Sequence, residues 1–275
     1  DFILAKDGTP KILEFNADTP TSLLEASVIQ WQWKEDVFPE CDQFNGIHEG
    51  LVQSWKDIFP KKGEIHFAGA LENNEDTGTL QYLASTAMEA GFSTRVLDMQ
   101  ALDLQNGRFF DPAGELVNRC FKLYPWEWMV DESPDGCLAE MEWLEPIWKL
   151  VMSNKAILAT LYELFPDSPY VLPCYLSRPR SGLFCKKPVF SREGHNVSVV
   201  DIRDWEEYVR IAETEGDYNT GAYVYQEYVE PTAYSGRYPV IGSWIIGGEA
   251  AGIGIRENRM EVTDNLSEFV PHIIG

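Results

Sequence analysis

The order of predicted elements between positions 63 and 97 restricts the fold more than any other feature. A short apolar segment from Gly63 to Ala70 is typical of a buried strand, and a helix is expected from Gly78 to Ala90 after an acidic turn at 71–77. Gly91 suits the end of that helix, and a further strand is expected over Phe92–Leu97. Strand, helix and strand in this order predict a parallel α/β unit.

The second half of the chain follows a different pattern. Apart from a helix opening near Ser153 and another expected over Trp205–Glu213, its apolar segments are short and β-like. This composition of elements predicts a mostly antiparallel sheet, and therefore two lobes of different architecture. The expected strands lie at 183–189, 196–200, 222–228, 241–246 and 251–256.

Composition and charge narrow the class of protein. The 275 residues are 44% hydrophobic, which is enough for a sizeable core. A formal net charge of −22 argues against nucleic acid and anionic membranes as partners; it is compatible with a cationic substrate, and equally with solubility alone. No apolar run approaches the ~18 to 20 residues that span a bilayer, and five scattered cysteines fit reduced thiols. We therefore expect a cytoplasmic protein.

A candidate metal site lies near the start of the chain. Residues Ile12 to Asn16 have the pattern of a strand, and a period of two would place the side chains of Glu14 and Asn16 on one face. Magnesium usually binds through one or two carboxylates together with the phosphates of its nucleotide, and Asp1 could supply another acid. The alternative is that these side chains form the solvated face of an edge strand, because the pattern is weak.

Candidate phosphate-binding residues follow in the second half. Lys186 and Lys187 end a predicted strand, and Ser191, Arg192, Glu193 and Gly194 form a turn whose backbone N–H groups could cover phosphates. Lys155, at a predicted helix start, would be better understood with a phosphate opposite. The alternative interpretation is a set of solvated lysines.

The segment Gln226-Glu227-Tyr228 closes a predicted strand of alternating Tyr and Val. Exposed backbone beside an amide side chain would suit the donor and acceptor edge of adenine. Near the start of the chain, the polar turn Asp18–Ser22 precedes a helix expected from Leu23 to Trp33, and such an N–H-rich corner can hold an anion.

Taken together and in order, several motifs resemble the synthetase domain of the glutathionylspermidine synthase family, from the first residue to the last. The motifs are Glu-Phe-Asn-Ala-Asp-Thr-Pro-Thr-Ser, Lys-Leu-Tyr-Pro-Trp-Glu-Trp, Glu-Pro-Ile-Trp-Lys, Ser-Asn-Lys-Ala-Ile-Leu, Lys-Lys-Pro-Val-Phe-Ser-Arg-Glu-Gly, Tyr-Gln-Glu-Tyr, Gly-Ser-Trp and Thr-Asp-Asn-Leu-Ser-Glu-Phe-Val-Pro-His-Ile-Ile.

The resemblance implies an α+β fold of the ATP-grasp class, circularly permuted as in glutathione synthetase, with an adjoining preATP-grasp α/β region. It implies that residues 1–60 carry the metal-ligand strand and helix, 61–150 the preATP-grasp-like substrate region, and 151–275 the nucleotide-binding lobes. The implied cofactors are ATP and Mg²⁺. The implied reaction is ATP-dependent amide formation between an acid and an amine through an acyl phosphate.

The resemblance also implies roles for single residues. Asp1, Glu14 and Asn16 match magnesium ligands, Lys155, Lys187 and Gln226 match ATP contacts, and Ser191 to Gly194 match a loop over the triphosphate. Arg256 matches a catalytic arginine near the phosphates and the acid. Thr19 and Thr21 are expected to contact substrate, and Glu75 with Asp76 to hold the amine, for which a polyamine is one candidate. The alternative for these two acids is a cap on the helix that follows.

Three positions depart from the family pattern. Leu123 and Trp128 stand where threonines help to hold glutathione, and Asn265 stands where a phosphate-side lysine is expected. A further family arginine is expected two positions before Asp1, outside the sequence. The sequence therefore predicts a ligase for small-molecule acids and amines whose acid need not be glutathione. The alternative function is a nucleotide-binding regulatory or scaffold protein without catalysis.

Overall fold

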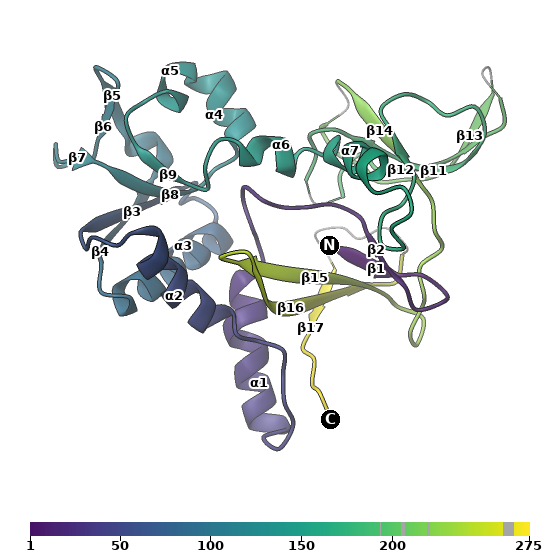
Figure 1. Cartoon of the computed structure of the whole chain (residues 1–275), viewed down its shortest axis with the longest axis horizontal. Coiled ribbons are helices and arrows are strands. Elements are labelled where there is room, and N and C mark those ends of the chain that lie inside the picture. The colour runs from purple at the N-terminus through teal and green to yellow at the C-terminus, as the bar shows by residue number, and fades with distance from the viewer. Residues whose placement is uncertain (193, 205–206, 219–220, 261–266) are drawn as a thin grey trace. The chain divides into compact units, whose positions relative to one another are not determined.

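The computed structural model describes every residue of the chain except 193, 205–206, 219–220 and 261–266 (Figure 1). The chain divides into two compact units, each assembled from segments that are distant in the sequence. The first unit comprises Asp1–Phe15, Val151–Gly242 and Ile255–Val270; the second comprises Asn16–Leu150, Ser243–Gly254 and Pro271–Gly275. The segment Asp1–Phe15 therefore belongs with the second half of the chain.

A parallel sheet forms the centre of the second unit. Its strands, in the order β4-β3-β8-β9, are β4 (Ser93–Asp98), β3 (Glu64–Gly69), β8 (Arg119–Leu123) and β9 (Glu142–Leu144). The pairings of β3 with β4 and β8, and of β8 with β9, are all parallel. Because helix α3 (Asn74–Glu89) connects β3 to β4, the predicted parallel α/β unit is confirmed.

Helix α3 begins at Asn74, earlier than the predicted start at Gly78. The side chain of Asn73 accepts a hydrogen bond from the backbone N–H of Glu75 (2.9 Å) and caps the helix. Most of the acidic segment that was predicted to be a turn is therefore the first turn of the helix, where acidic side chains interact favourably with the helix dipole.

The core of the second unit lies between the sheet and its helices. Figure 1 shows α3 and α2 (Ile47–Ile58) together on one side of the sheet. The Trp55 ring of α2 meets the edges of Phe67 and Phe121, with centroids 5.6 and 6.4 Å apart. Gly69 permits α3 to pack closely on β3, because a Cβ there would lie 2.9 Å from Cδ1 of Leu80.

The second unit also contains a small antiparallel sheet. It consists of β5 (Asp103–Gln105), β6 (Arg108–Phe110) and β7 (Leu116–Val117), and the last two strands pair with Phe109 opposite Val117. The buried side chains of Phe109 and Val117 cluster with Ala68 and Cys120 of the parallel sheet. The other elements of this unit are a π-helix (Glu25–Ile29), α1 (Gln30–Val37), a 3-10 helix (Met99–Ala101), α4 (Trp126–Glu132) and α5 (Pro134–Cys137).

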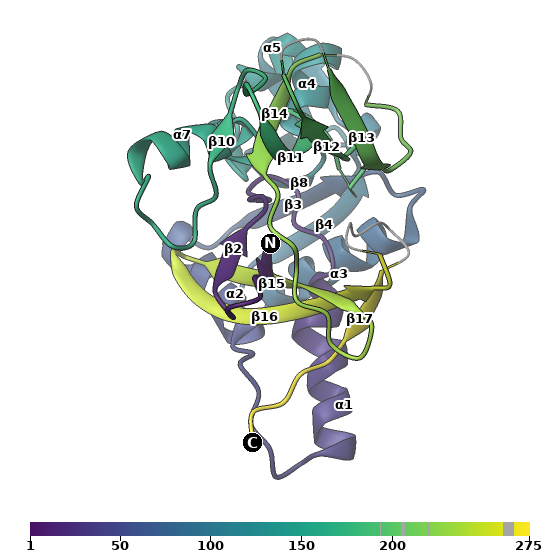
Figure 2. The same ribbon diagram turned by 90° about the vertical axis from the view of Figure 1, so that its right-hand side faces the viewer.

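The first unit contains an antiparallel sheet, as predicted for the second half of the chain. Its order is β10 (Cys174–Tyr175), β14 (Tyr223–Glu227), β11 (Gly182–Pro188), β12 (Ser198–Ile202) and β13 (Tyr208–Glu213). Figure 2 shows these strands side by side, with helix α7 (Ile157–Leu164) against β10 and β14. Helix α6 (Lys149–Ser153) precedes α7.

The helix predicted over Trp205–Glu213 is wrong. Residues 205–206 lie outside the described part of the chain, and Tyr208–Glu213 form strand β13. This strand pairs antiparallel with β12, from Ile202 opposite Tyr208 to Ser198 opposite Glu213. Pairing with a neighbouring strand outweighs the local preference that a window of sequence conveys.

A second sheet contains both strands of the segment Asp1–Phe15. Its order is β17 (Glu268–Val270), β16 (Glu249–Asn258), β15 (Tyr238–Ile246), β1 (Phe2–Leu4) and β2 (Pro10–Ile12). Strands β1 and β2 form a hairpin in which Phe2 is opposite Ile12. The backbone N–H of Leu13 donates to the carbonyl of Asp1 (2.8 Å), so Asp1 lies beside the residues that follow β2.

The strand predicted over Ile12–Asn16 is therefore misplaced. Strand β2 ends at Ile12, and Glu14 and Asn16 follow it in irregular backbone. The carbonyl oxygens of Ile12 and Leu13 accept hydrogen bonds from side chains of Gln226 and Lys187 instead of from a partner strand.

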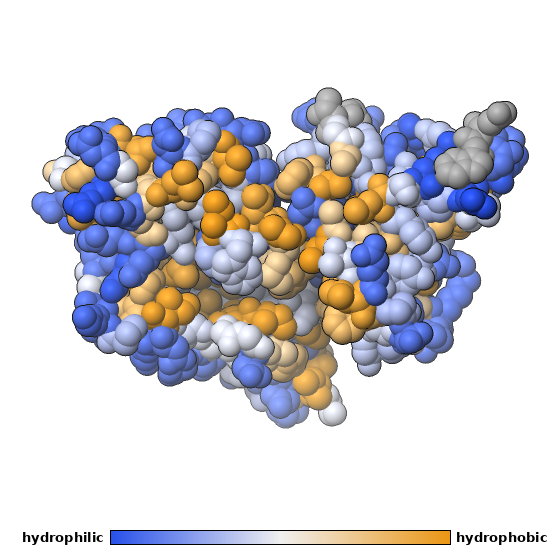
Figure 3. All heavy atoms as spheres, turned by 45° about the horizontal axis from the view of Figure 1, so that its top comes forward, coloured by the Kyte–Doolittle hydropathy of each residue, from blue (hydrophilic) through white to orange (hydrophobic). Residues whose placement is uncertain are grey.

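The visible surface is largely hydrophilic, with separate apolar patches on the face shown in Figure 3. Among the residues that the structure describes, none of the helices combines the length and the apolar character that a membrane span requires.

A buried ion pair fixes the segment that leads into the second unit. The Lys122 ammonium contacts the Asp18 carboxylate, and both side chains are completely buried. The same ammonium donates to the carbonyl of Tyr124 (2.9 Å), while the other carboxylate oxygen of Asp18 accepts from the backbone N–H of Trp126 (2.8 Å). The pair therefore joins the chain at position 18 to β8 and to the start of α4.

We expect Lys122→Met to lower the free energy of unfolding by about 3 to 5 kcal/mol, because the substitution leaves the carboxylate of Asp18 buried without its cation. Arg108→Met is the control, since Arg108 and Glu140 form an exposed pair worth at most about 1 kcal/mol. Denaturant unfolding of both variants measures the difference, and equal losses would contradict the role given to the buried pair.

Candidate nucleotide-binding site

A cavity in the first unit gathers many of the residues predicted from the sequence. Its polar residues include Asp1, Glu14, Lys155, Lys187, Gln226 and Glu227, and Gly194 and Tyr228 also line it. Its apolar walls include Ile3 of β1, Val240 of β15 and four residues outside the strands, Leu13, Leu172, Val197 and Val229. An apolar pocket with a few convergent charged groups is typical of a small-molecule site.

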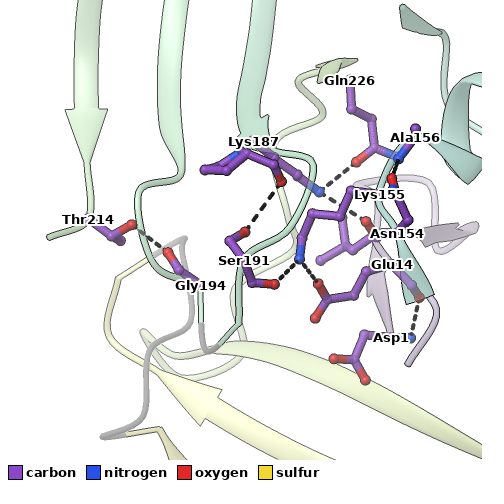
Figure 4. A network of polar contacts seen from close by, with 12 residues as sticks. Asp1, Glu14, Asn154, Lys155, Ala156, Lys187, Ser191, Gly194, Thr214 and Gln226 are labelled. Carbon is purple, nitrogen blue, oxygen red and sulfur yellow. Dashed lines mark hydrogen bonds and ion pairs between the residues drawn. The ribbon is translucent and has the colours of Figure 1, made fainter. Parts of the chain in front are cut away.

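Two carboxylates face this cavity, and each is paired with a cation. Glu14 Oε2 lies 3.0 Å from Lys155 Nζ, and Asp1 Oδ2 lies 3.0 Å from an Nη atom of Arg256 in β16. The backbone nitrogen of Asp1 also donates to the carbonyl of Glu14 (3.0 Å). Figure 4 shows the two acidic side chains next to each other at one side of the network. The β1–β2 hairpin therefore creates a pair of acids from residues thirteen positions apart.

Two lysines are buried against these acids. Lys155 lies in the turn before α7, where its backbone N–H donates to the Val189 carbonyl (3.0 Å), and its ammonium donates to the Ser191 carbonyl (2.6 Å). Lys187 lies on β11, and its ammonium donates to the Leu13 carbonyl (3.0 Å) and to Oε1 of Gln226 (2.7 Å). The two lysines are only 7% and 6% exposed. Lysines this deeply buried are rare unless they are paired.

The charges of these groups shift their pKa values. Burial alone would raise the pKa of Glu14, but the positive charges of Lys155 and Lys187 lower it from 4.5 to about 2. Burial lowers the pKa of Lys187, and the nearby carboxylate of Glu14 opposes that shift. The site thus holds a carboxylate that stays ionised at neutral pH.

The predicted phosphate loop adjoins this network. The buried side chain of Ser191 donates to the Pro188 carbonyl (3.4 Å), and the Ser191 carbonyl accepts from Lys155. The carbonyl of Arg192 accepts from the backbone N–H of His195 (2.9 Å). Gly194 has a φ of 68°, a conformation that glycine adopts without strain, and Figure 4 shows its carbonyl bonded to Thr214. Glu193 lies outside the described residues.

The segment Gln226-Glu227-Tyr228 lines the cavity, but two of its backbone N–H groups and the Gln226 side chain bond to other parts of the protein. The backbone N–H of Glu227 donates to the Pro173 carbonyl (2.7 Å) and that of Tyr228 to the Leu183 carbonyl (3.0 Å). The side chain of Gln226 is 1% exposed, and its Nε2 donates to the Ile12 carbonyl (2.8 Å).

The donor set fits magnesium held jointly with a nucleotide. The described residues contain no group of three or more acidic, histidine or cysteine side chains placed to hold a metal alone. Asp1 and Glu14 nevertheless offer two carboxylates in one cavity with two lysines. Since Mg²⁺ commonly binds through one or two carboxylates and the phosphates of its nucleotide, these residues fit the implied ion.

The remaining predicted residues belong to the second unit. Asn16 and Thr21 are exposed and Thr19 is half-buried, all in the irregular segment that follows Glu14. Glu75 and Asp76 occupy the first turn of α3. This position supports the helix-cap alternative for the two acids, and the roles predicted for all five residues toward ligands stay predictions.

Sequence reasoning missed part of the cavity wall. Cys185 was given no role among the five cysteines of the sequence, but it lines the cavity and lies opposite Gln226 in the β11–β14 register. The period of two along β11 was a usable signal, because it places Cys185 on the same face as Lys187. Leu172 and Val240 carried no such signal, since only tertiary packing brings them to the site.

Comparisons with solved structures define the class of the fold. A glutathione synthetase-like effector from Globodera pallida matches all of this chain and 75% of its own, with a TM-score of 0.58 and 10% sequence identity. At this identity the match shows the fold alone. The protein thus has a glutathione synthetase-like fold of mixed helices and sheets, which agrees with the predicted α+β class.

The sequence assigns the family. The family described as glutathionylspermidine synthase preATP-grasp matches residues 1–275, so the chain belongs to this family. A Haemophilus influenzae protein named "Putative acid--amine ligase" is 38% identical over 95% of this chain and 70% of its own length. Trypanothione synthetase from Crithidia fasciculata is 28% identical over 94% of this chain and 44% of its own length. The resemblance seen in the sequence is confirmed, and the predicted class of activity agrees with the names of these relatives.

The ion pair at Glu14 generates a prediction about pH. Because the pKa of Glu14 is depressed to about 2, its contribution to stability is present above about pH 4.5 and is lost as the pH falls toward 2. We expect the ¹³C carboxyl resonance of Glu14 to titrate well below its ordinary midpoint of 4.5. Lys155→Met should move that midpoint upward. An ordinary midpoint in the unaltered protein would contradict the buried pair.

Proposed function

We propose that the chain is the ATP- and Mg²⁺-dependent catalytic part of a ligase that joins a carboxylic acid to an amine through an acyl phosphate. Its fold would be a circularly permuted ATP-grasp fold of the glutathione synthetase type. Family membership supports the class of reaction, and the cavity in the first unit supports the position of the nucleotide. The chain spans 70% and 44% of the two relatives, so the activity of the whole protein is part of the proposal.

One observation carries the proposal: two buried lysines and two carboxylates line the same cavity. Burying ammonium groups is costly unless partners compensate their charge. Glu14 supplies one negative charge within 3.0 Å of Lys155, whereas Lys187 is held by neutral oxygens of Leu13 and Gln226. A triphosphate would give both lysines anionic partners.

The residues have distinct tasks in the first step. Lys155 and Lys187 bind phosphate oxygens, with the segment from Ser191 to Gly194 beside them. Asp1 and Glu14 would hold Mg²⁺, which neutralises charge on the transferring phosphoryl group when bound. A carboxylate oxygen of the acid attacks the γ-phosphorus, the bond to ADP breaks, and an acyl phosphate forms.

The second step forms the amide. The amine nitrogen attacks the acyl carbon, inorganic phosphate leaves, and the amine loses a proton. Arg256 lies 3.0 Å from Asp1 and would hold the acid or the acyl phosphate by its guanidinium. Leu123 is buried and offers no hydroxyl, which supports an acid other than glutathione. A polyamine suits the net charge of −22.

The test of nucleotide binding uses two adjacent lysines. We expect Lys187→Ala to weaken the binding of magnesium ATP, measured by calorimetry, by about tenfold or more, because it removes a charged donor. Lys186→Ala is the matched control: its ammonium lies over the ring of Tyr223 at 3.9 Å, away from the network. Equal effects of the two substitutions would contradict the assignment of the phosphate site.

Turnover separates the ligase from a non-catalytic scaffold. The protein is incubated with ATP and a panel of acids and amines, and phosphate release that requires both substrates supports the ligase. Glu14→Gln should abolish this release and leave the protein folded at the assay temperature, checked by circular dichroism, with a lower thermal midpoint because the buried ammonium of Lys155 loses its ionic partner. Tight ATP binding without any turnover across the panel would favour the scaffold function.

Neutralising Glu75 and Asp76 tests the amine site. If these acids hold the amine, the double variant Glu75→Gln with Asp76→Asn raises the KM for the amine and leaves that for ATP unchanged. The control is Glu72→Gln, an exposed acid just before the helix. If both KM values are unchanged and only stability falls, the acids serve the N-terminus of α3, where Asn73 already caps the helix.

A further inference from the structure

Gln226 holds a central position in the nucleotide-binding sheet. It lies on β14, opposite Cys174 of β10 and Cys185 of β11, and its side chain is 1% exposed. A buried amide needs partners for both its oxygen and its nitrogen, because an unpaired polar group costs free energy. The identity of those partners decides what the side chain can do.

The two ends of the amide have unambiguous partners. A lysine ammonium can only donate, so the atom 2.7 Å from Lys187 must be the oxygen Oε1 of Gln226. The carbonyl of Ile12 can only accept, so the atom 2.8 Å from it must be Nε2. Figure 4 shows the Gln226 amide directed at the end of Lys187.

Lys187 extends the same network to the acidic segment. Its ammonium also donates to the carbonyl of Leu13 (3.0 Å). The consecutive carbonyls of Ile12 and Leu13 are therefore both held by side chains from the sheet β10-β14-β11-β12-β13. The next residue is Glu14, whose carboxylate lies 3.0 Å from Lys155.

The chemistry of an amide matters here. The oxygen of Gln226 stabilises the buried ammonium of Lys187 without cancelling its charge, which remains available to an anion. A carboxylate in the same place would form an ion pair with the lysine and compete with phosphate for it. An apolar side chain would form neither the hydrogen bond with Lys187 nor the one with the Ile12 carbonyl.

We propose that Gln226 is a positioning residue, which orients Lys187 and holds the segment bearing Glu14 in register with it. The proposal rests on the function proposed above. It assigns Gln226 an action through Lys187 and Ile12, whereas the sequence alone suggested a direct contact with ATP.

Comparing two ligands tests this role. Adenosine carries the base without phosphates, and magnesium ATP carries both. We expect Gln226→Leu to lower the affinity for magnesium ATP by about tenfold to a hundredfold, and to leave the affinity for adenosine within about twofold of its original value. Calorimetry and competition measure both affinities. Gln226→Glu keeps an acceptor for Lys187, but its carboxylate would compete with phosphate for the lysine. This variant should therefore also lower the affinity for magnesium ATP and not that for adenosine. An equal loss for both ligands, or no loss for magnesium ATP, overturns the proposal.

Gln43→Leu is the matched control. Gln43 is also a buried glutamine whose Nε2 donates to backbone carbonyls, those of Gln30 (3.2 Å) and His272 (2.8 Å) in the second unit. We expect this variant to lose stability without changing either affinity. A selective loss of magnesium ATP binding in Gln43→Leu would overturn the proposal, because any buried glutamine would then have the same effect.

A double-mutant cycle identifies the path of the effect. If Gln226 acts through Lys187, then Gln226→Leu costs little further affinity for magnesium ATP in a Lys187→Met background. Additive losses would overturn the proposal. If the unaltered protein binds neither ligand, the proposed function itself fails. If the unaltered protein binds magnesium ATP and Gln226→Leu leaves that affinity unchanged, only the positioning role is overturned.

Discussion

The burial of two ammonium groups in one cavity is the physical constraint on which the site depends. Lys155 and Lys187 lose most of their hydration, so the protein must surround them with oxygen atoms. The Glu14 carboxylate, the side-chain oxygen of Gln226 and the backbone carbonyls of Leu13 and Ser191 do this within hydrogen-bonding distance. The same oxygens fix where the first segment of the chain lies, because two of its residues, Leu13 and Glu14, are among the acceptors.

The arrangement of the sheets explains how distant residues meet. The β1–β2 hairpin returns the chain upon itself, so Asp1 and Glu14 become neighbours. The antiparallel register of β11 with β14 places Gln226 opposite Cys185 and near Lys187. Each of these contacts follows from backbone pairing, which is insensitive to the identity of most side chains along the strands. Only the few strand residues whose side chains face the cavity therefore need a particular identity for the site to form.

The periodic segments of the chain were predicted best. The parallel unit around β3, α3 and β4 and the antiparallel character of the later strands follow from local patterns of burial. The strand expected over Ile12–Asn16 and the helix expected over Trp205–Glu213 failed for a shared reason. The carbonyls of Ile12 and Leu13 bond to side chains of Gln226 and Lys187, and Tyr208–Glu213 pair with strand β12. In both cases the backbone conformation depends on partners outside the segment, which its own residue pattern does not reveal.

The sequence by itself determined the family, the fold class and the identity of the charged residues, because motif order and residue chemistry are local properties of the chain. It also indicated Lys155, Lys187, Glu14 and Asp1 as one group. Only the tertiary structure decided how they are paired, that Asp1 meets Arg256, and that the Gln226 amide bonds to Lys187 and to the Ile12 carbonyl. The physical reason is that a buried polar group takes whichever partner the packed backbone brings within about 3 Å, and packing is a property of the whole unit.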